Sequence, residues 1–291
     1  MTSAADTAPS PASPPAAEAA LAALRGEIDR LDDQLHDLVM RRAEVVASLA
    51  ASRVKGGASP LRPGREAMIL RRLLRRHHGD LPPGAMVRLW REILASSSAM
   101  QGGFSVAVYA RDPNQPRLAR EHFGSMTPVR SMPTAARALA AVGSGEAQVA
   151  VLPLPEEGEP PEQAWWLWLD APRLQVVARL PFWAANAETL PEAFAVTPGA
   201  PDPSGADRSL LRLELAEDRG RTALLAALAA AGLAPRSLLT RRDGGAVRAL
   251  AEVDGVVAEG DPRLAALPFD RALPLGFYAI PERGPERGNQ G

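Results

Sequence analysis

Apolar residues near the N-terminus recur at a helical spacing. From Leu21 to Leu38, leucine and isoleucine follow one another at alternating steps of three and four residues, which places them along one face of an α-helix. No proline or glycine interrupts the segment Glu27–Lys55. A helix of about thirty residues is roughly 50 Å long, so a small domain cannot bury the whole apolar stripe. We therefore expect a partner chain to cover it.

Charged residues appear on the same stripe farther along the chain. At the same spacing beyond Leu38, the stripe reaches Arg42 and then Arg53, which lie about 20° apart around the helix. Arg25 lies about 100° from Arg42 and faces another surface. A buried cation without a partner is costly. Arg42 and Arg53 therefore require an anion, either a carboxylate of the protein or a ligand.

Two further amphipathic helices are predicted after the first. The second begins near Pro63, a residue that is favoured in the first helical turn, and its inner face carries Glu66 beside isoleucine and leucine. The third follows two consecutive prolines and places Ser97 and Gln101, four residues apart, at inner positions. These polar side chains form either a buried network, in which Glu66 pairs with Arg42 or Arg53, or a cationic pocket for a small dianion. The whole set favours the pocket, because one carboxylate cannot neutralise several inward cations.

The same region contains polar residues that we expect at the surface. The arginines of the second helix at positions 71, 72, 75 and 76 predict a solvated face. His77 and His78 follow that helix and have no further ligands at a suitable spacing, so we expect surface histidines and no metal site.

The pattern changes after residue 102 to short strands and short helices. Residues 104–110, 148–154 and 174–182 predict strands, and residues 116–122 and 133–142 predict helices. This alternation indicates an open α/β layer.

The last segment has a different order of elements. Residues 209–280 predict a strand, a helix, two strands joined by the turn Asp243-Gly244-Gly245, a short helix and a final strand. The order is βαββαβ.

Composition and charge narrow the classes of protein. The 291 residues carry 33 Lys and Arg, of which Lys55 is the single lysine, against 34 Asp and Glu. The formal net charge of −1 argues against a general nucleic-acid binder. The absence of cysteine excludes thiol catalysis and disulfide scaffolds. Residues 21–101 carry 14 basic and 9 acidic residues, a net charge of +5, which indicates an anionic ligand for this segment.

The sequence shows neither a membrane span nor a secretory signal. No uncharged apolar run is long enough to span a membrane. The first twenty residues contain neither Lys nor Arg, which a secretory signal requires. We therefore expect a cytoplasmic protein.

Four short motifs follow one another in the helical segment. They are Leu24-Arg25-x-x-Ile28-Asp29-x-Leu31-Asp32, Arg41-Arg42, Pro63-x-Arg65-Glu66 and Ser97-x-x-x-Gln101. Over residues 21–101 this order resembles the all-α chorismate mutases. The resemblance implies an intertwined dimer with two active sites, each holding chorismate, and an isomerase that uses no metal or cofactor.

The resemblance assigns the substrate carboxylates to cations. Arg25 resembles the arginine that reaches into the partner's site to hold one carboxylate, and Arg42 the arginine that binds the other. Ser97 resembles a carboxylate contact from the third helix, and Arg65 occupies the position of a supporting arginine.

The resemblance also assigns the ether oxygen and the hydroxyl of the substrate. Arg53, where the family usually has lysine, and Gln101 are expected at the ether oxygen, and Glu66 at the hydroxyl. Arg62 stands where many members have an aspartate near the hydroxyl, which leaves hydroxyl recognition to Glu66. Lys55 lies about 200° from Arg53 around the helix and cannot easily take its place.

The rest of the chain faintly resembles one lobe of prephenate dehydratase followed by an ACT domain. Residues 121–124 and 145–153 carry the dehydratase-like motifs. Three functional segments of that family are replaced here by Ala110–Pro113, Pro155–Glu157 and Glu192–Phe194. We therefore predict that dehydratase activity is absent.

The expected fold class is multidomain. An all-α three-helix chorismate mutase domain, intertwined as a dimer, is followed by an α/β region and an ACT-like α+β region. The expected boundaries are a disordered tail at 1–17, the mutase domain at 18–102, the dehydratase-like region at 103–200, the ACT-like domain at 205–281 and a disordered tail at 282–291.

Three functions remain open. Chorismate mutase is the leading interpretation, with a homodimer as the expected assembly and neither nucleic acid nor a membrane as a partner. Isochorismate-pyruvate lyase uses the same helical fold and a similar cationic pocket. The third interpretation is a catalytically weak regulatory module that binds another enzyme of the aromatic pathway. The dehydratase-like order of the later segments favours the mutase.

Overall fold

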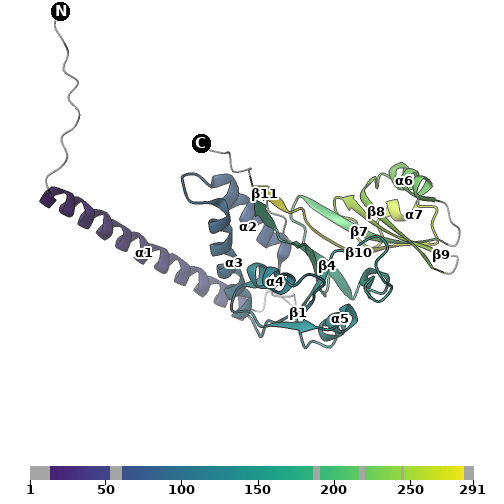
Figure 1. The fold of residues 1–291 in the computed structure, drawn as a ribbon, viewed down its shortest axis with the longest axis horizontal. Helices are drawn as coiled ribbons and strands as arrows, with labels where there is room; N and C mark the ends of the chain where they lie inside the picture. Colours follow the sequence, from purple (N-terminus) through teal and green to yellow (C-terminus); the bar gives the residue numbers. More distant parts are fainter. Residues whose placement is uncertain (1–13, 53–60, 186–190, 216–219, 244–245, 285–291) are drawn as a thin grey trace, which may run out of the picture. The chain divides into compact units, whose positions relative to one another are not determined.

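The computed structural model describes residues 14–52, 61–185, 191–215, 220–243 and 246–284 (Figure 1). The chain divides into two compact units, Met1–Gly56 and Gly57–Gly291. In the described part of the chain, no helix has the length and apolar character needed to cross a membrane.

The first unit contains one long helix, α1 (Pro14–Ala51). It begins earlier than the sequence predicts, because proline is readily accommodated in a first helical turn. Residues 14–17, which were expected in a disordered tail, are therefore helical. The apolar stripe is confirmed as a continuous face, and its leucine and isoleucine side chains are exposed.

The second and third helices of the predicted three-helix domain belong to the second unit. They are α2 (Pro63–Arg76) and α3 (Pro83–Ala99). Helix α2 contacts strands of the large sheet, and α3 contacts a short strand and helix α4. Because these helices bury their faces against the C-terminal region, the compact unit begins before α2 rather than after α3.

One mixed sheet of nine strands organises the described part of the second unit. Its order is β2-β1-β3-β6-β4-β10-β7-β9-β8. The strands are β1 (Val106–Tyr109), β2 (Val129–Met132), β3 (Val149–Pro153), β4 (Leu174–Leu180), β6 (Ala193–Pro198), β7 (Asp207–Leu215), β8 (Pro235–Asp243), β9 (Ala246–Asp254) and β10 (Arg271–Ala279). Strands β1, β2 and β3 are parallel, β4 and β10 are parallel, and the other pairs are antiparallel.

Helices cover both faces of the first half of this sheet. Alternate residues of β1 and β3 point to opposite faces, as the period of a strand requires. One face packs against α4 (Gln115–Phe123), and the other against α5 (Ala135–Gly143) and the short helix η1 (Trp165–Leu167). The α/β layer expected for this region is thus confirmed.

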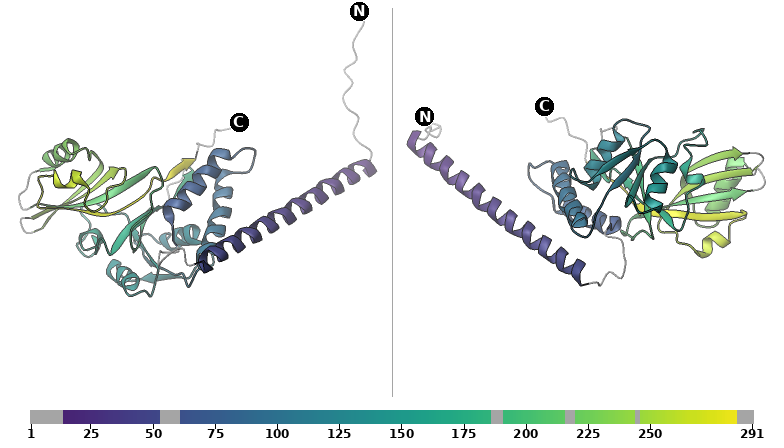
Figure 2. Two further views of the ribbon diagram at one scale, coloured as in Figure 1. Left: turned by 180° about the vertical axis from the view of Figure 1, so that it is seen from behind. Right: turned by 90° about the horizontal axis from the view of Figure 1, so that it is seen from below.

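The βαββαβ order expected for the last segment is also present. It runs β7, α6 (Gly220–Ala230), β8, β9, α7 (Pro262–Ala265) and β10. Helices α6 and α7 lie at the end of the sheet that β7, β8 and β9 form (Figure 2). They pack on these strands through leucine side chains.

The large sheet runs through both of the expected C-terminal regions, which meet where β10 lies beside β4. Strand β10 runs beside β4, with Gly276 opposite Val176. A Cβ atom on Gly276 would lie 2.2 Å from the carbonyl oxygen of Val176, and Gly276 has φ +122°. Only glycine fits there without strain. The sheet therefore continues across the boundary that the sequence places between residues 200 and 205.

A second sheet, of two short strands, includes the last described residues. Strand β11 (Glu282–Gly284) pairs in parallel with β5 (Trp183–Ala185). Residues 282–284 were expected in a disordered tail, and this expectation is wrong. The backbone N–H of Glu282 donates to the carbonyl of Phe182 at 2.7 Å, which holds β11 beside β5.

Candidate active site

Three predicted cations of the site belong to the first unit. Arg25 is exposed on α1 and Arg42 is half-buried on the apolar stripe. Arg53 lies outside the described residues. The two described arginines thus have the helical placement that the sequence predicts, whereas their roles toward a substrate stay predictions.

Glu66 is paired with a cation that the sequence pattern did not single out. Arg91 on α3 donates from Nη1 to Oε2 of Glu66 at 2.9 Å, across the α2–α3 interface. The side chains are 6% and 13% exposed, respectively. Charge-assisted hydrogen bonds of this length are strong when they are shielded from water. Arg91 therefore orients the Glu66 carboxylate.

The surroundings of Arg91 explain why it needs this partner. Its guanidinium lies 5.5 Å from the centroid of the Phe182 ring, and burial lowers the pKa of Arg91 against the opposing charge and hydrogen bond of Glu66. Burial, together with the charge of Arg91, lowers the pKa of the nearby His122 well below its ordinary value. His122 is therefore neutral at pH 7, and Glu66 supplies the negative charge that this region requires.

Ser97 and Gln101 lie together near the end of α3. Ser97 is buried, and its hydroxyl donates to the carbonyl of Ile93 at 2.7 Å. The amide nitrogen of half-buried Gln101 donates to the carbonyl of Ser97 at 2.8 Å. The predicted i, i+4 placement is confirmed. In this state the two side chains bond to their own helix.

The buried faces of α2 and α3 are turned relative to the sequence prediction. Helix α2 buries Gly64, Ala67, Leu70 and Arg71, so Ile69 remains only half-buried. Helix α3 buries the following residues: Met86, Val87, Arg91, Leu94, Ser97 and Ser98. Positions 87, 91, 94 and 98 on α3 also follow helical spacing, beside the positions that contain Ser97 and Gln101. This second set could have indicated that Arg91 is buried.

Arg71 contradicts the prediction of a wholly solvated basic face. It is buried, and its Nε donates to Oε1 of Glu282 at 2.6 Å. Its terminal nitrogens donate to the hydroxyl of Ser204 at 2.9 Å and to the carbonyl of Ile280 at 2.7 Å. The other three arginines of that group are exposed as predicted. Arg71 is the one whose position on the helix faces the sheet, where carbonyls and Glu282 compensate its charge.

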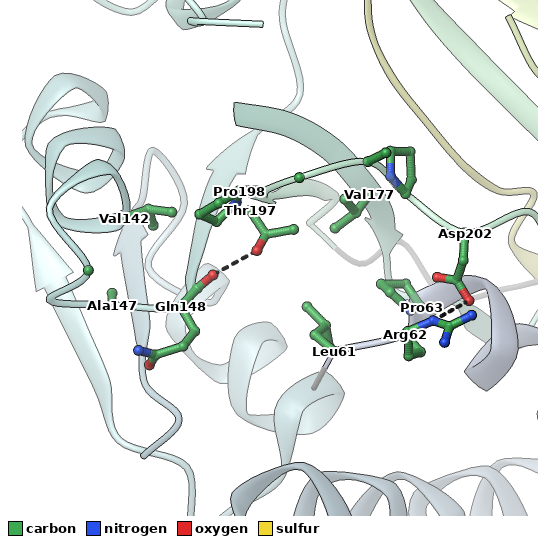
Figure 3. A pocket seen from close by; sticks show the side chains of 14 residues that line it. Leu61, Arg62, Pro63, Val142, Ala147, Gln148, Val177, Thr197, Pro198 and Asp202 are labelled. Carbon is green, nitrogen blue, oxygen red and sulfur yellow. Dashed lines mark hydrogen bonds and ion pairs between the residues drawn. The ribbon is translucent and has the colours of Figure 1, made fainter. Parts of the chain in front are cut away.

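The start of α2 is held by a residue from the loop between β6 and β7. Asp202 accepts hydrogen bonds from the backbone N–H groups of Gly64 and Arg65 and pairs with Arg62. The Arg65 side chain is exposed. A pocket of about 660 Å³ opens beside these residues, with Gln148 and Thr197 on its opposite wall (Figure 3).

The histidines after α2 make local contacts. Nε2 of His77 lies 2.6 Å from the carbonyl oxygen of Leu81, and Nδ1 of His78 lies 3.0 Å from that of Arg76. Within the described ranges, no group of three or more His, Asp or Glu side chains has the arrangement of a metal site.

An ionic cluster occupies the carboxyl ends of β1 and β3. Arg111 follows β1, and its guanidinium pairs with Glu159 at 3.1 Å and Glu156 at 3.5 Å and donates to the carbonyl of Leu154. Trp166 donates from Nε1 to Glu159 at 2.9 Å. Burial raises the pKa of Glu159, although the hydrogen bond from Trp166 and the charge of Arg111 oppose the shift. In open α/β sheets, ligands bind at this end of the strands, and here protein side chains fill it.

A second polar network crosses several strands of the sheet. Arg179 on β4 donates to Glu192 at 3.0 Å and lies 3.5 Å from Glu252 on β9. The Tyr278 hydroxyl on β10 donates to Glu252 at 2.5 Å. Burial and the charge of Glu252 raise the pKa of Tyr278, so the phenol stays protonated. Glu192 thus takes part in a structural network that joins the two C-terminal regions.

These features define a multidomain protein with candidate anion-binding residues on its N-terminal helices and a mixed α/β sheet in its second unit. Comparison with known proteins agrees, because residues 24–102 match the family chorismate mutase type II. The resemblance of the N-terminal third to the chorismate mutases is thereby confirmed.

Two curated relatives are each described as a bifunctional chorismate mutase/prephenate dehydratase. The protein of Stutzerimonas stutzeri is 31% identical over 147 residues, and that of Pseudomonas aeruginosa is 30% identical over 145 residues. Each match covers 48% of this chain and 40% of the relative. The chain therefore spans about two fifths of the length of the curated relatives it matches.

Similar solved structures are more distant. One is described as GqqA, a novel type of quorum quenching acylase; it is 20% identical with a TM-score of 0.48, and the match covers 61% of this chain and 96% of that one. Prephenate dehydratase from Arthrobacter aurescens in complex with L-Phe is 15% identical with a TM-score of 0.46, covering 60% and 89%.

Proposed function

We propose that this chain is a chorismate mutase that converts chorismate to prephenate by an intramolecular Claisen rearrangement. The observation that carries the proposal is the match of residues 24–102 to chorismate mutase type II. This span contains all seven residues to which the resemblance assigns a role, from Arg25 to Gln101.

The proposed reaction suits these side chains. No proton is transferred and no covalent adduct forms, so the enzyme has to hold the reactive conformer and stabilise charge on the breaking ether bond. Arg25 and Arg42 hold the two carboxylates, since guanidinium groups bind carboxylates in a planar, bidentate manner. Arg53 and Gln101 stabilise the negative charge on the ether oxygen. Ser97 has to turn from its own helix toward a carboxylate when the substrate binds.

The contact between Arg91 and Glu66 supports the assigned role of Glu66. A carboxylate that accepts the substrate hydroxyl has to be ionised and fixed in direction. Arg91 provides a buried cation at 2.9 Å for this purpose. Arg62, at the position where many family members have an aspartate, pairs with Asp202, so Glu66 carries hydroxyl recognition.

We also propose that a second copy of the chain covers α1. Large exposed apolar side chains follow its stripe, namely Leu21, Leu24, Ile28, Leu31, Leu35, Leu38, Val45 and Leu49. A continuous apolar face of this length indicates a protein interface. Pairing two such helices would bring Arg25 of one chain to the site of the other, as the resemblance implies.

We propose that dehydratase activity is absent. The ionic cluster of Arg111 with Glu156 and Glu159 fills the carboxyl ends of the parallel strands. Glu192 is engaged by Arg179, and the catalytic segment of the dehydratases is replaced at that point.

Identification of the products tests these proposals together. Purified protein is given chorismate or isochorismate in separate assays, and the products are identified by mass spectrometry. Prephenate from chorismate is the expected result. Salicylate and pyruvate from isochorismate would instead identify a lyase. No turnover of either compound would favour a regulatory module. Enzymatic formation of phenylpyruvate would refute the proposed absence of dehydratase activity.

A pair of arginine variants then tests the assignment at the ether oxygen. Arg53→Ala is expected to lower kcat/KM on the order of 100-fold, the scale of one lost transition-state contact. Arg41→Ala removes an exposed arginine of the same basic segment and serves as the control. Near-wild-type kcat/KM in Arg53→Ala would refute the role of Arg53.

A further inference from the structure

The first turn of α2 carries two candidate site residues but has no cap from its own segment. Arg62 precedes the helix and makes no side-chain hydrogen bond to it. The first backbone N–H groups of any α-helix lack partners within the helix. Because Arg65 and Glu66 lie in this turn, the position of the Glu66 backbone depends on how firmly the turn is held.

Asp202 supplies the missing cap from far along the chain. Its Oδ1 accepts from the N–H of Gly64 at 3.1 Å, and its Oδ2 accepts from the N–H of Arg65 at 3.0 Å. Nε of Arg62 lies 3.2 Å from the same Oδ2, and the Asp202 side chain is only 14% exposed (Figure 3). A carboxylate at this end of a helix also complements the helix dipole.

The residue at position 64 of α2 allows the backbone of Asp202 to come close to the helix. A Cβ atom at Gly64 would lie 1.9 Å from the carbonyl oxygen of Asp202. Any other residue at position 64 would push the loop away and lengthen both capping bonds. Gly64 and Asp202 therefore fit one another across 138 residues of sequence.

The loop that carries Asp202 is itself braced. Oδ2 of Asp207 accepts from the backbone N–H groups of Ser204 and Gly205 at 2.9 and 3.1 Å. Arg71, two turns into α2, donates to the Ser204 hydroxyl at 2.9 Å and to the carbonyl of Ala206 at 3.1 Å. The same loop thus holds α2 at its start and again near its middle.

We propose that Asp202 is a positioning residue of the mutase site, an inference that rests on the proposed function. Its carboxylate fixes the first turn of α2 and thereby the direction from which Glu66 meets the substrate. The loop between β6 and β7 then contributes to catalysis without touching the substrate.

Kinetics of Asp202 variants in the full-length chain test this inference. Asp202→Ala is expected to lower kcat/KM about 10- to 100-fold, because a small misplacement of a contact residue has effects of this size. Asp202→Asn keeps a hydrogen-bond acceptor but loses the charge, so its kcat/KM is expected to lie between those of wild type and Asp202→Ala. Asp261→Ala is the matched control: Asp261 caps α7 at the N–H of Arg263 and pairs with the Arg263 side chain, so the same chemistry is lost away from the site. Its kcat/KM should stay within about twofold of wild type.

A double-mutant comparison separates positioning from general stability. In a Glu66→Gln background, Asp202→Ala should change kcat/KM by less than about twofold, because both changes act on one contact. The same fold loss in both backgrounds, or a lower Tm with unchanged kcat/KM, would overturn the inference.

Amide hydrogen exchange gives a readout that does not depend on turnover. Exchange of the Gly64 and Arg65 amides should be faster in Asp202→Ala than in wild type, and unchanged in Asp261→Ala. An inactive wild-type protein would overturn the proposed function, whereas unchanged exchange at residues 64 and 65 would overturn the capping role itself.

Discussion

Helix α1 and helix α2 have similar amphipathic sequences but different surroundings. On α1, Leu24, Leu31 and Leu38 are 59%, 51% and 64% exposed. On α2, Leu70 is fully buried and Arg71 reaches the loop after β6 and the end of β10. Helical periodicity predicts an apolar face on both helices, but in the structure only α2 has its face covered, whereas the stripe of α1 is exposed.

This difference separates catalysis from the stability of the second unit. Arg25 and Arg42 stand on the helix whose stripe is exposed, whereas Glu66, Ser97 and Gln101 stand on or beside helices that are packed within the second unit. If the proposed function is correct, activity requires α1 to be covered. Folding of the second unit depends on its own core.

The largest effect is expected from charges on the α1 stripe. The double variant Leu31→Asp/Leu35→Asp should abolish dimer formation, because carboxylates at an apolar interface are costly to bury. Chorismate mutase activity should fall on the order of 100-fold or more. Analytical ultracentrifugation and a mutase assay measure the two effects.

His36→Asp on the same helix is the control for that variant. His36 lies about 100° from Leu35 around the helix, and its side chain is 73% exposed. The control should retain both the dimer and the activity. Dimers of normal affinity in the double aspartate variant would show that the stripe is not the interface.

A smaller effect, on folding alone, is expected from Arg71. Arg71→Ala leaves Glu282 and several carbonyls without their donor, which should lower the free energy of unfolding by about 2–4 kcal/mol, since Glu282 is partly exposed. Urea denaturation of the full chain measures this change. Arg72→Ala, next to it on the exposed face, should stay within about 0.5 kcal/mol of wild type. Equal effects would mean that the buried network contributes nothing.

His122 gives a pH-dependent test of the packing behind α3. Its folded pKa is well below 6.5 because of burial and the charge of Arg91, so the unfolded chain takes up a proton that the folded chain refuses. Stability is therefore full above pH 6.5 and is lost as pH falls below it. Between pH 7.5 and 5.5 wild type should lose on the order of 1 kcal/mol more of its free energy of unfolding than His122→Asn, measured by urea denaturation. His78→Asn, at an exposed position, is the control, and equal pH dependence of wild type and His122→Asn would contradict the burial of a neutral ring.

The sequence predicts the elements well because their signals are local. The leucine spacing of α1, the prolines before α2 and α3, and the βαββαβ order all depend on residues close together in the chain. Short strands such as β2 and β5 were not predicted, since four or fewer residues carry little pattern of their own. Gly276 shows where local signals are insufficient. A side chain is excluded at position 276 by the backbone of β4, a hundred residues earlier in the chain.

The candidate site was predictable in its residue types but only partly in its contacts. The spacing selected Glu66, Ser97 and Gln101, whereas the cation that meets Glu66 is Arg91, from a position beside the predicted stripe. The cap from Asp202 could not be predicted, because nothing local indicates that a carboxylate 137 residues away will meet the Arg65 amide. Contacts of this kind depend on tertiary packing rather than on periodicity.

The smallest effect is expected from exposed arginines in the two regions, and it tests whether burial alone distinguishes them. Arg30 on α1 donates to the carbonyl of Gly26 at 3.0 Å, about 120° from the centre of the stripe. Arg117 on α4 pairs with Glu121 at 2.8 Å, with its side chain 73% exposed. Arg30→Ala and Arg117→Ala should each change the free energy of unfolding by less than about 0.5 kcal/mol, as exposed ion pairs and hydrogen bonds contribute little. Urea denaturation at two protein concentrations measures both. A loss of unfolding free energy above about 1 kcal/mol in Arg30→Ala that grows on dilution would contradict this expectation. It would show that the assembly buries α1 beyond its stripe. Helices α1 and α2 would then both be buried and would differ only in what covers them.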